Sequence, residues 1–199
     1  MPEFAISNGM QYILPAGAKA ELARETYRLH HYLWHGVRSV WEALTDTQRR
    51  AILTIQLGWA PPRPGRDSAG NILLDNNSGE DFLFMHRRMI GHLNALLAAE
   101  GQPQITGWNS IPGPDDPDYP VPDFPIFTPQ KTVEFWKECI VGWEALYSEP
   151  AYLRSISLGR LGAQIEFGIH NAVHNRWKKE SPVGYRPASA LSETINARW

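Results

Sequence analysis

The chain has 199 residues, of which 43% are apolar and 20% are charged, a balance typical of one globular domain with its own core. Nineteen basic and 21 acidic side chains give a formal net charge of -2, so the charge does not favour a nucleic-acid partner. No run of about 18 apolar residues is present, which predicts no membrane-spanning helix. The single cysteine excludes a disulfide framework, and the N-terminus lacks the features of a secretory signal, so we expect a cytoplasmic protein.

Helical periodicity covers most of the chain, and capping residues mark several of the ends. Thr45 or Asp46 is expected to cap the second helix, and Gly58 to end it. Gly101 and Pro103 are expected to end the third. The predicted helices span about residues 17–42, 45–58, 81–99, 129–147 and 162–178, followed by a short one at 189–199.

Two long segments between these helices read as irregular loops. Residues 59–79 lack strand alternation, and residues 107–129 contain seven prolines, which do not fit inside helices or central strands. Loops of this length in a small domain are often functional. The predicted fold class is therefore mainly α, a helix bundle with long proline-rich loops, formed as a single domain over residues 1–199.

The chain contains seven histidines, and two pairs have the spacing of metal ligands on a helix. His31 and His35, like His170 and His174, lie four residues apart, so both rings of a pair can reach one ion. A histidine from a facing helix would complete a three-nitrogen site inside the bundle. Imidazole suits zinc, copper, iron or nickel, so the spacing alone does not select the metal.

The surroundings of the first pair favour a different role. Tyr27, Arg28 and Arg38 form an ordinary amphipathic pattern around His31 and His35. We therefore expect this pair to be hydrogen-bonded or solvated rather than metal-binding. His92 lies beyond the apolar face of its helix and is expected to be exposed.

Two segments resemble the copper-binding motifs of the tyrosinase family of type-3 copper proteins. IEFGIHNAVHNRW is similar to the second-copper motif, and FLFMHRRMI to the segment that carries the last ligand of the first copper. VRSVWEALTDTQRRAIL and the closing TINARW are similar to flanking helices of the family, so the resemblance covers about residues 37–199. The residues that carry the two motifs are Phe82, Leu83, His86 and Arg87, and Glu166, Gly168, His170, Asn171, His174 and Trp177.

The resemblance implies a tyrosinase-like helix bundle with copper ligands at His86, His170 and His174. The family's three other histidine ligands would fall near Trp59, near Asn77 and near Leu191 or Ser192, where this chain has no histidine. A coupled dicopper centre is therefore not expected. We expect instead one ion bound by three imidazoles, with an open fourth position. Residues 1–36 form a helical extension outside the resemblance, and a second copper held by its His31 and His35 remains an alternative.

The resemblance also gives Glu166 and Asn171 catalytic roles, because the matching pair in the family orders a water near the metal and helps to take a phenolic proton. The predicted function is a tyrosinase-like oxidoreductase with one copper ion, acting on a phenolic or other aromatic small molecule. The first alternative is an enzyme without oxygen chemistry, with zinc or no metal, that uses the histidines and Glu166 for acid–base catalysis in an isomerisation, cyclisation or hydrolysis. The second is a metal-free binding protein. A homo-oligomer or an accessory chaperone stays open, and no nucleic acid or membrane is expected as a partner.

Overall fold

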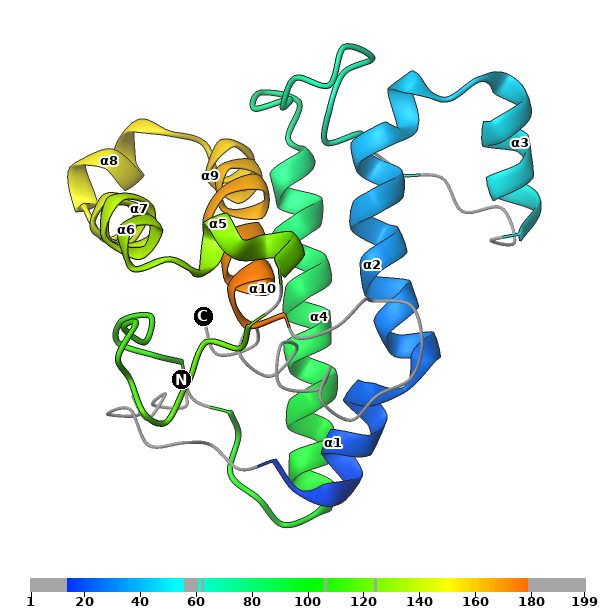
Figure 1. The fold of residues 1–199 in the computed structure, drawn as a ribbon. Helices are drawn as coiled ribbons and strands as arrows, with labels where there is room; N and C mark the ends of the chain where they lie inside the picture. The colour runs from blue at the N-terminus through cyan, green and yellow to red at the C-terminus, as the bar shows by residue number, and fades with distance from the viewer. Residues whose placement is uncertain (1–13, 56–60, 62, 106, 124, 179–199) are drawn as a thin grey trace.

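The computed structural model describes residues 14–55, 61, 63–105, 107–123 and 125–178, and this part of the chain is mainly helical, as predicted (Figure 1). No named strand occurs within these ranges, where Arg66 and Ile72 form an isolated bridge. None of the helices described is both long and apolar enough to span a bilayer. The elements are α1 (Ala16–Ala23), α2 (Glu25–Val40), η1 (Trp41–Ala43), α3 (Asp46–Ile55), α4 (Ser78–Ala99), η2 (Pro125–Phe127), α5 (Thr128–Lys131), α6 (Val133–Phe135), η3 (Trp136–Ile140), α7 (Val141–Tyr147), α8 (Pro150–Ser155), α9 (Leu158–Ile165), η4 (Glu166–His170) and α10 (Asn171–Trp177).

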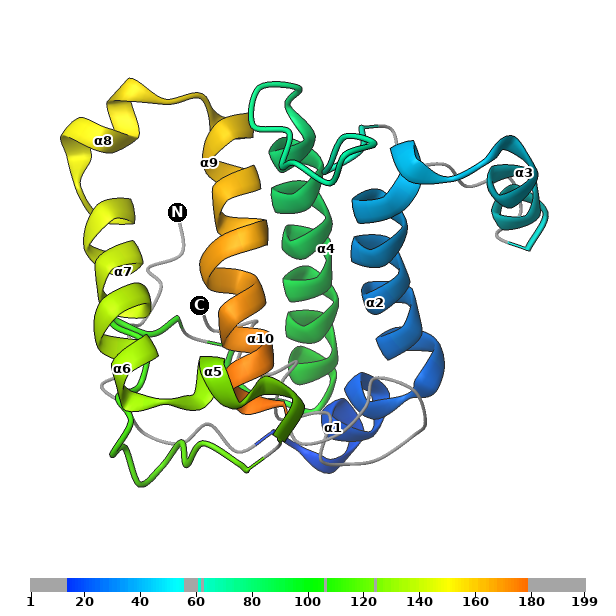
Figure 2. The same ribbon diagram turned by 45° about the horizontal axis from the view of Figure 1, so that its top comes forward.

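Helix α4 lies at the centre of the bundle. In both views α2 runs along one side of α4, and the continuous segment from α9 to α10 runs along the other (Figures 1 and 2). Helices α6 and α7 lie beyond α9 and α10, while α3 projects away from the bundle (Figure 2). Three helical segments that are far apart in the sequence thus share one interior.

Glycines bring α4 and α9 into direct backbone contact. A Cβ atom at Gly79 would overlap the carbonyl oxygen of Gly159 and the amide nitrogen of Ala163. A Cβ atom at Gly162 would likewise overlap the carbonyl of Gly79. Only residues without a side chain allow the two backbones to come this close. The contact therefore fixes the position of α9 against α4, and with it the positions of the functional side chains on these segments.

Several predicted helix boundaries were wrong. The first predicted helix breaks at Arg24, whose ψ of 137° is extended, so α1 and α2 are separate. The helix predicted at 129–147 breaks at Thr132, whose side chain accepts a hydrogen bond from the Phe135 amide and starts a new helix. The helix predicted at 162–178 starts earlier, at Leu158, because Ser157 caps it. Periodicity did not predict α8, which is only 6 residues long.

The predicted caps agree with the structure where it describes them. Thr45 and Gln48 form a reciprocal capping box before α3: the Thr45 amide donates to Gln48 Oε1, and the Gln48 amide to Thr45 Oγ1. Gly101 has a φ of 67°, and its amide donates to the carbonyl of Ala98, which ends α4 as expected. The predicted stop at Gly58 and the predicted helix at 189–199 lie outside the described residues.

The proline-rich segment packs against the outer face of α10 through what we call the aromatic cluster. Trp177 is buried there, and its indole N–H donates to the carbonyl of Tyr119 at 3.1 Å. Because proline cannot supply N–H donors, large side chains rather than backbone pairing hold this segment. The buried members of the cluster are Ile111, Tyr119, Ile140, Ile169, Val173 and Trp177.

Candidate metal centre

The inward face of α2 carries polar side chains. His31 and Arg38 are buried, and Trp34 lies between them on the same face. Buried polar groups of this kind are stable only when they have partners inside the protein. Those partners come from α4 and from the segment running from η4 to α10.

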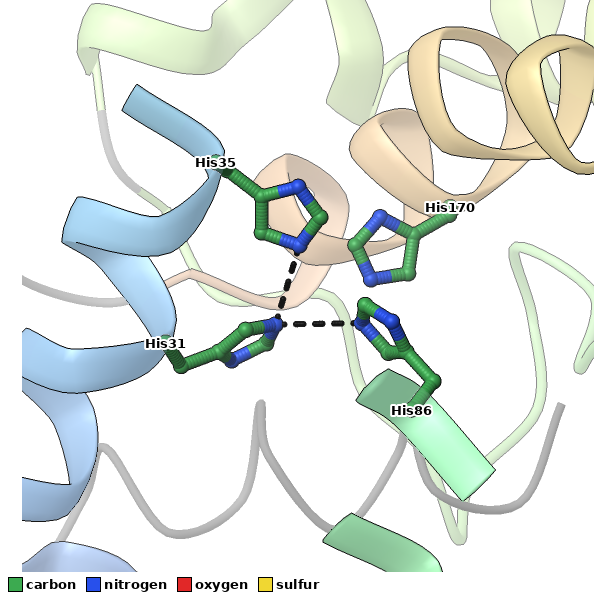
Figure 3. A group of neighbouring side chains, drawn as sticks. All are labelled: His31, His35, His86 and His170. Atoms are coloured by element: carbon green, nitrogen blue, oxygen red, sulfur yellow. Dashed lines mark hydrogen bonds between the residues drawn. The ribbon is translucent and has the colours of Figure 1, made fainter. Parts of the chain in front are cut away.

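Four histidines from three segments converge between these helices, and we call them the histidine group: His31, His35, His86 and His170 (Figure 3). Each offers a ring nitrogen, and these four nitrogens all lie within 4.8 Å of one another. Nε2 of His31 is 3.2 Å from Nε2 of His35 and 3.2 Å from Nε2 of His86. The group is thus close enough to bind one metal ion.

These separations suit ligands of a common ion. Metal–nitrogen bonds of about 2.0–2.1 Å in a tetrahedral site place neighbouring nitrogens about 3.3–3.4 Å apart, close to the 3.2 Å seen here. In addition, Nε2 of His170 is buried and has no hydrogen-bond partner. The donor set consists of nitrogen alone, which suits zinc, copper, iron or nickel and does not distinguish among them.

Hydrogen bonds to the outer nitrogens set which ring nitrogen faces the centre. Nδ1 of His86 lies 2.9 Å from the carbonyl oxygen of Phe82, which can only accept a hydrogen bond, so Nδ1 carries the proton. Nδ1 of His35 lies 2.9 Å from Oε1 of Glu166 and donates to that carboxylate in the same way. When such a ring is neutral, its Nε2 presents a lone pair to the histidine group, as metal-binding histidines do.

The charge state of the group also suits metal binding. Burial, together with the neighbouring histidines, holds the pKa of His35 well below its usual range. The pKa of His170 is lowered in the same direction by burial and then by His174 and His86. A ring that stays neutral at physiological pH keeps a lone pair free for an ion.

Glu166 is itself anchored by a buried cation. Nη1 of Arg38 donates to Oε1 of Glu166 at 2.6 Å, while Nη2 donates to the carbonyl of Ser78 at 2.7 Å. Burial raises the pKa of Glu166 to about 7, against the lowering effect of the Arg38 guanidinium. The second carboxylate oxygen, Oε2, is buried and has no hydrogen-bond partner. The carboxylate therefore makes both its hydrogen bonds through one oxygen.

A single π-helical turn carries Glu166 and His170. Residues four apart in such a turn lie on the same side of the helix, which places the carboxylate and the ring on one face. Gly168, with φ of −101° and ψ of −108°, departs from helical geometry in the middle of this turn. Such single-turn π segments in α-helices frequently occur at functional sites.

The structure brings together most of the predicted site residues. His86 and His170 belong to the histidine group, and Glu166 contacts it through His35. The ring of His174 lies beside it, with its centroid 4.5 Å from that of His170 and 5.0 Å from that of His31. Asn171 is exposed, so the structure does not place it in this interior.

His31 and His35 are hydrogen-bonded to each other, as expected, but they do not form an isolated pair. Both belong to the histidine group, and they come from the segment predicted to be only an extension. One signal could have found them: Arg38, Trp34 and His31 recur at helical spacing and share the buried face. His92 is exposed, as predicted.

Of the three positions where the family would have further ligands, the structure describes only the one near Asn77. Asn77 has a left-handed φ of 60° and immediately precedes α4. Trp59, Leu191 and Ser192 lie outside the described residues. The two additional histidines therefore come from α2, at positions that the resemblance did not include.

Comparisons with known proteins add no family assignment. No family model matches the sequence, and no curated protein matches it either.

Proposed function

We propose that the histidine group binds one copper ion and that the protein oxidises a phenolic or other aromatic small molecule at this centre. The observation that carries the proposal is the convergence of four histidines, whose ring nitrogens lie within 4.8 Å of one another. The resemblance of the segments around His86 and His170 to tyrosinase motifs supports copper over the other metals that nitrogen ligands suit.

In this proposal each residue has a defined part. His31, His35, His86 and His170 would hold the ion, which supplies redox chemistry with oxygen when bound. His31 is 3% exposed and the His35 side chain 22%, so the group lies closest to solvent at His35. Trp34 and Phe82 lie against the rings of His35 and His86 and give this interior an apolar wall.

Metal analysis and an oxidation assay test the proposal. Protein reconstituted with copper and desalted should retain about one copper per chain and should consume oxygen with a catechol. His170→Ala should lose both properties, because it removes a ligand that the buried centre cannot replace. His92→Ala is the matched control, since this exposed histidine lies outside the group and its loss should change neither.

Three results would contradict parts of this proposal. Failure of the native protein to retain copper overturns it, as does retention of both copper and oxidation by His170→Ala. Two copper ions per chain would contradict the single-ion centre and favour a coupled pair that includes His174, whose ring neighbours His31 and His170.

A zinc enzyme without oxygen chemistry is the second candidate. The observation that favours it is Oε2 of Glu166, a buried carboxylate oxygen without a hydrogen-bond partner, next to His35. A carboxylate beside a zinc site is a common proton acceptor. Retention of zinc in preference to copper, without oxygen uptake on catechol, would support this candidate and overturn the copper proposal.

A further inference from the structure

Three side chains connect the histidine group to the start of α4. Arg38 donates to Glu166, and Glu166 accepts from His35, so a buried cation, a carboxylate and an imidazole form a continuous chain. We infer that Arg38 is a positioning residue for the metal centre: acting through Glu166, it fixes the orientation and the donor nitrogen of His35. This inference rests on the metal binding proposed above.

The geometry makes Arg38 the fixed end of this chain. Its side chain is 0% exposed, and its Nη2 donates to the carbonyl of Ser78, where α4 begins. The guanidinium also lies 4.1 Å from the ring centroid of Trp34, a cation–π contact from within α2. Arg38 therefore has one position, set by groups that do not belong to the histidine group.

Glu166 transmits this position because a single oxygen takes part in both contacts. Oε1 lies 2.6 Å from Nη1 of Arg38 and 2.9 Å from Nδ1 of His35. A carboxylate with two separate contacts could shift one while keeping the other. Here the oxygen that accepts from Arg38 is also the oxygen that accepts from His35, so moving it changes both hydrogen bonds at once.

His35 depends on this support more than His86 does. The ring of His86 is anchored by the carbonyl of Phe82, which belongs to its own helix and is present whatever the side chains do. The ring of His35 has instead a side-chain anchor from another helical segment, the Glu166 carboxylate, and the His35 side chain is partly exposed. Without the carboxylate, His35 could turn its Nδ1 toward the centre or swing away from it.

Cobalt(II) titrations of the metal-free protein test the inference, because cobalt absorption in the visible range reports both binding and coordination number. Arg38→Met and Glu166→Gln should each weaken cobalt affinity about 10- to 100-fold, the usual cost of losing a group that orients a metal ligand. Their spectra should also differ from the native spectrum.

The double variant separates positioning from a merely structural role. If Arg38 acts through Glu166, Arg38→Met should weaken binding no further in the Glu166→Gln background. An Arg38→Met variant with native cobalt affinity and spectrum overturns the inference, however much its stability falls. Equal losses from Arg38→Met in both backgrounds also overturn it.

Two further measurements keep the test decisive. If Arg38→Met does not fold, Arg38→Lys takes its place. Lysine retains the positive charge but has one nitrogen in place of the two that donate to Glu166 and Ser78. The cobalt affinity of this variant should lie between those of the native protein and Glu166→Gln. Native protein that binds neither cobalt nor copper overturns the proposed function and the inference together. Native protein that binds cobalt, while the variants bind equally well, overturns the inference alone.

Discussion

The histidine group and the aromatic cluster lie on two sides of the same short segment, from η4 to α10, and they are built on different physical principles. Ile169, Val173 and Trp177 enter the aromatic cluster, whereas His170 enters the histidine group. The cluster is stabilised by removing large apolar surfaces from water. The histidine group buries polar rings, which folding alone does not favour.

This difference separates the part of the molecule that holds the fold from the part available for chemistry. Burying Arg38 and Glu166 costs free energy even when the two side chains are paired. We therefore infer that this arrangement serves something besides stability. Changes in the aromatic cluster should therefore lower stability and spare metal binding. Changes in the histidine group should instead weaken metal binding and spare stability.

Trp177→Ala is expected to have the largest effect on stability. It removes a 1% exposed indole and its hydrogen bond to Tyr119, and the free energy of unfolding should fall by about 3–5 kcal/mol. Copper retention by the fraction that remains folded should be native. Urea unfolding and metal analysis on the same samples check both statements, and a loss of copper from folded Trp177→Ala would break the separation of the two regions.

Gly79→Ala is expected to have the next largest effect, because the new Cβ would overlap the backbone of α9. Forcing α4 and α9 apart should lower the free energy of unfolding by about 3 kcal/mol and weaken metal binding, since these segments carry His86 and Glu166. Gly91→Ala on the same helix has open space around its Cβ and should instead be neutral or stabilising by up to about 1 kcal/mol. Equal effects of the two substitutions would show that the close approach is unimportant.

The stability of the metal-free protein should depend on pH through the histidine group. The pKa of His170 is lowered in the folded chain, so below the ordinary histidine value of about 6.5 the unfolded chain binds more protons. The free energy of unfolding should fall as the pH drops from 6.5, by up to about 1.4 kcal/mol per pH unit for each such histidine. Urea unfolding from pH 7.5 to 5.5 measures this slope, which should be smaller in His170→Gln and unchanged in Trp177→Phe.

The smallest effects on stability are expected at helix caps, where a substitution should lower the free energy of unfolding equally near either region. Thr132 caps α6 beside the aromatic cluster, and Ser157 caps α9, which leads to the histidine group. Thr132→Ala and Ser157→Ala should each cost about 1 kcal/mol. If Ser157→Ala also reduces copper retention while Thr132→Ala does not, the start of α9 contributes to the metal centre.

The helical fold and half of the histidine group could be predicted from the sequence. Apolar periodicity and capping residues are local signals, and they located the helices that became α3, α4 and α10, with the end of α4 at Gly101. His86 and His170 lie in segments with a recognisable pattern. Their convergence in the bundle interior was expected from that pattern.

The rest depends on contacts between distant parts of the chain. Nothing local to Arg38 shows that Glu166 lies opposite it, so a charged residue on α2 looked like part of a solvated face. For the same reason the sequence did not place His31 and His35 beside His86 and His170. The break at Arg24 and the division at Thr132 depend on single backbone angles, which a periodic apolar pattern does not register.

The chain has one cysteine, so it forms no disulfide within itself, yet an ion at the histidine group would act as a cross-link. It would connect α2 to α4 and to the segment that follows α9. Stripping the ion should then release α2 before the remaining helices, and limited proteolysis between α1 and α2 would become the most sensitive indicator of metal loss.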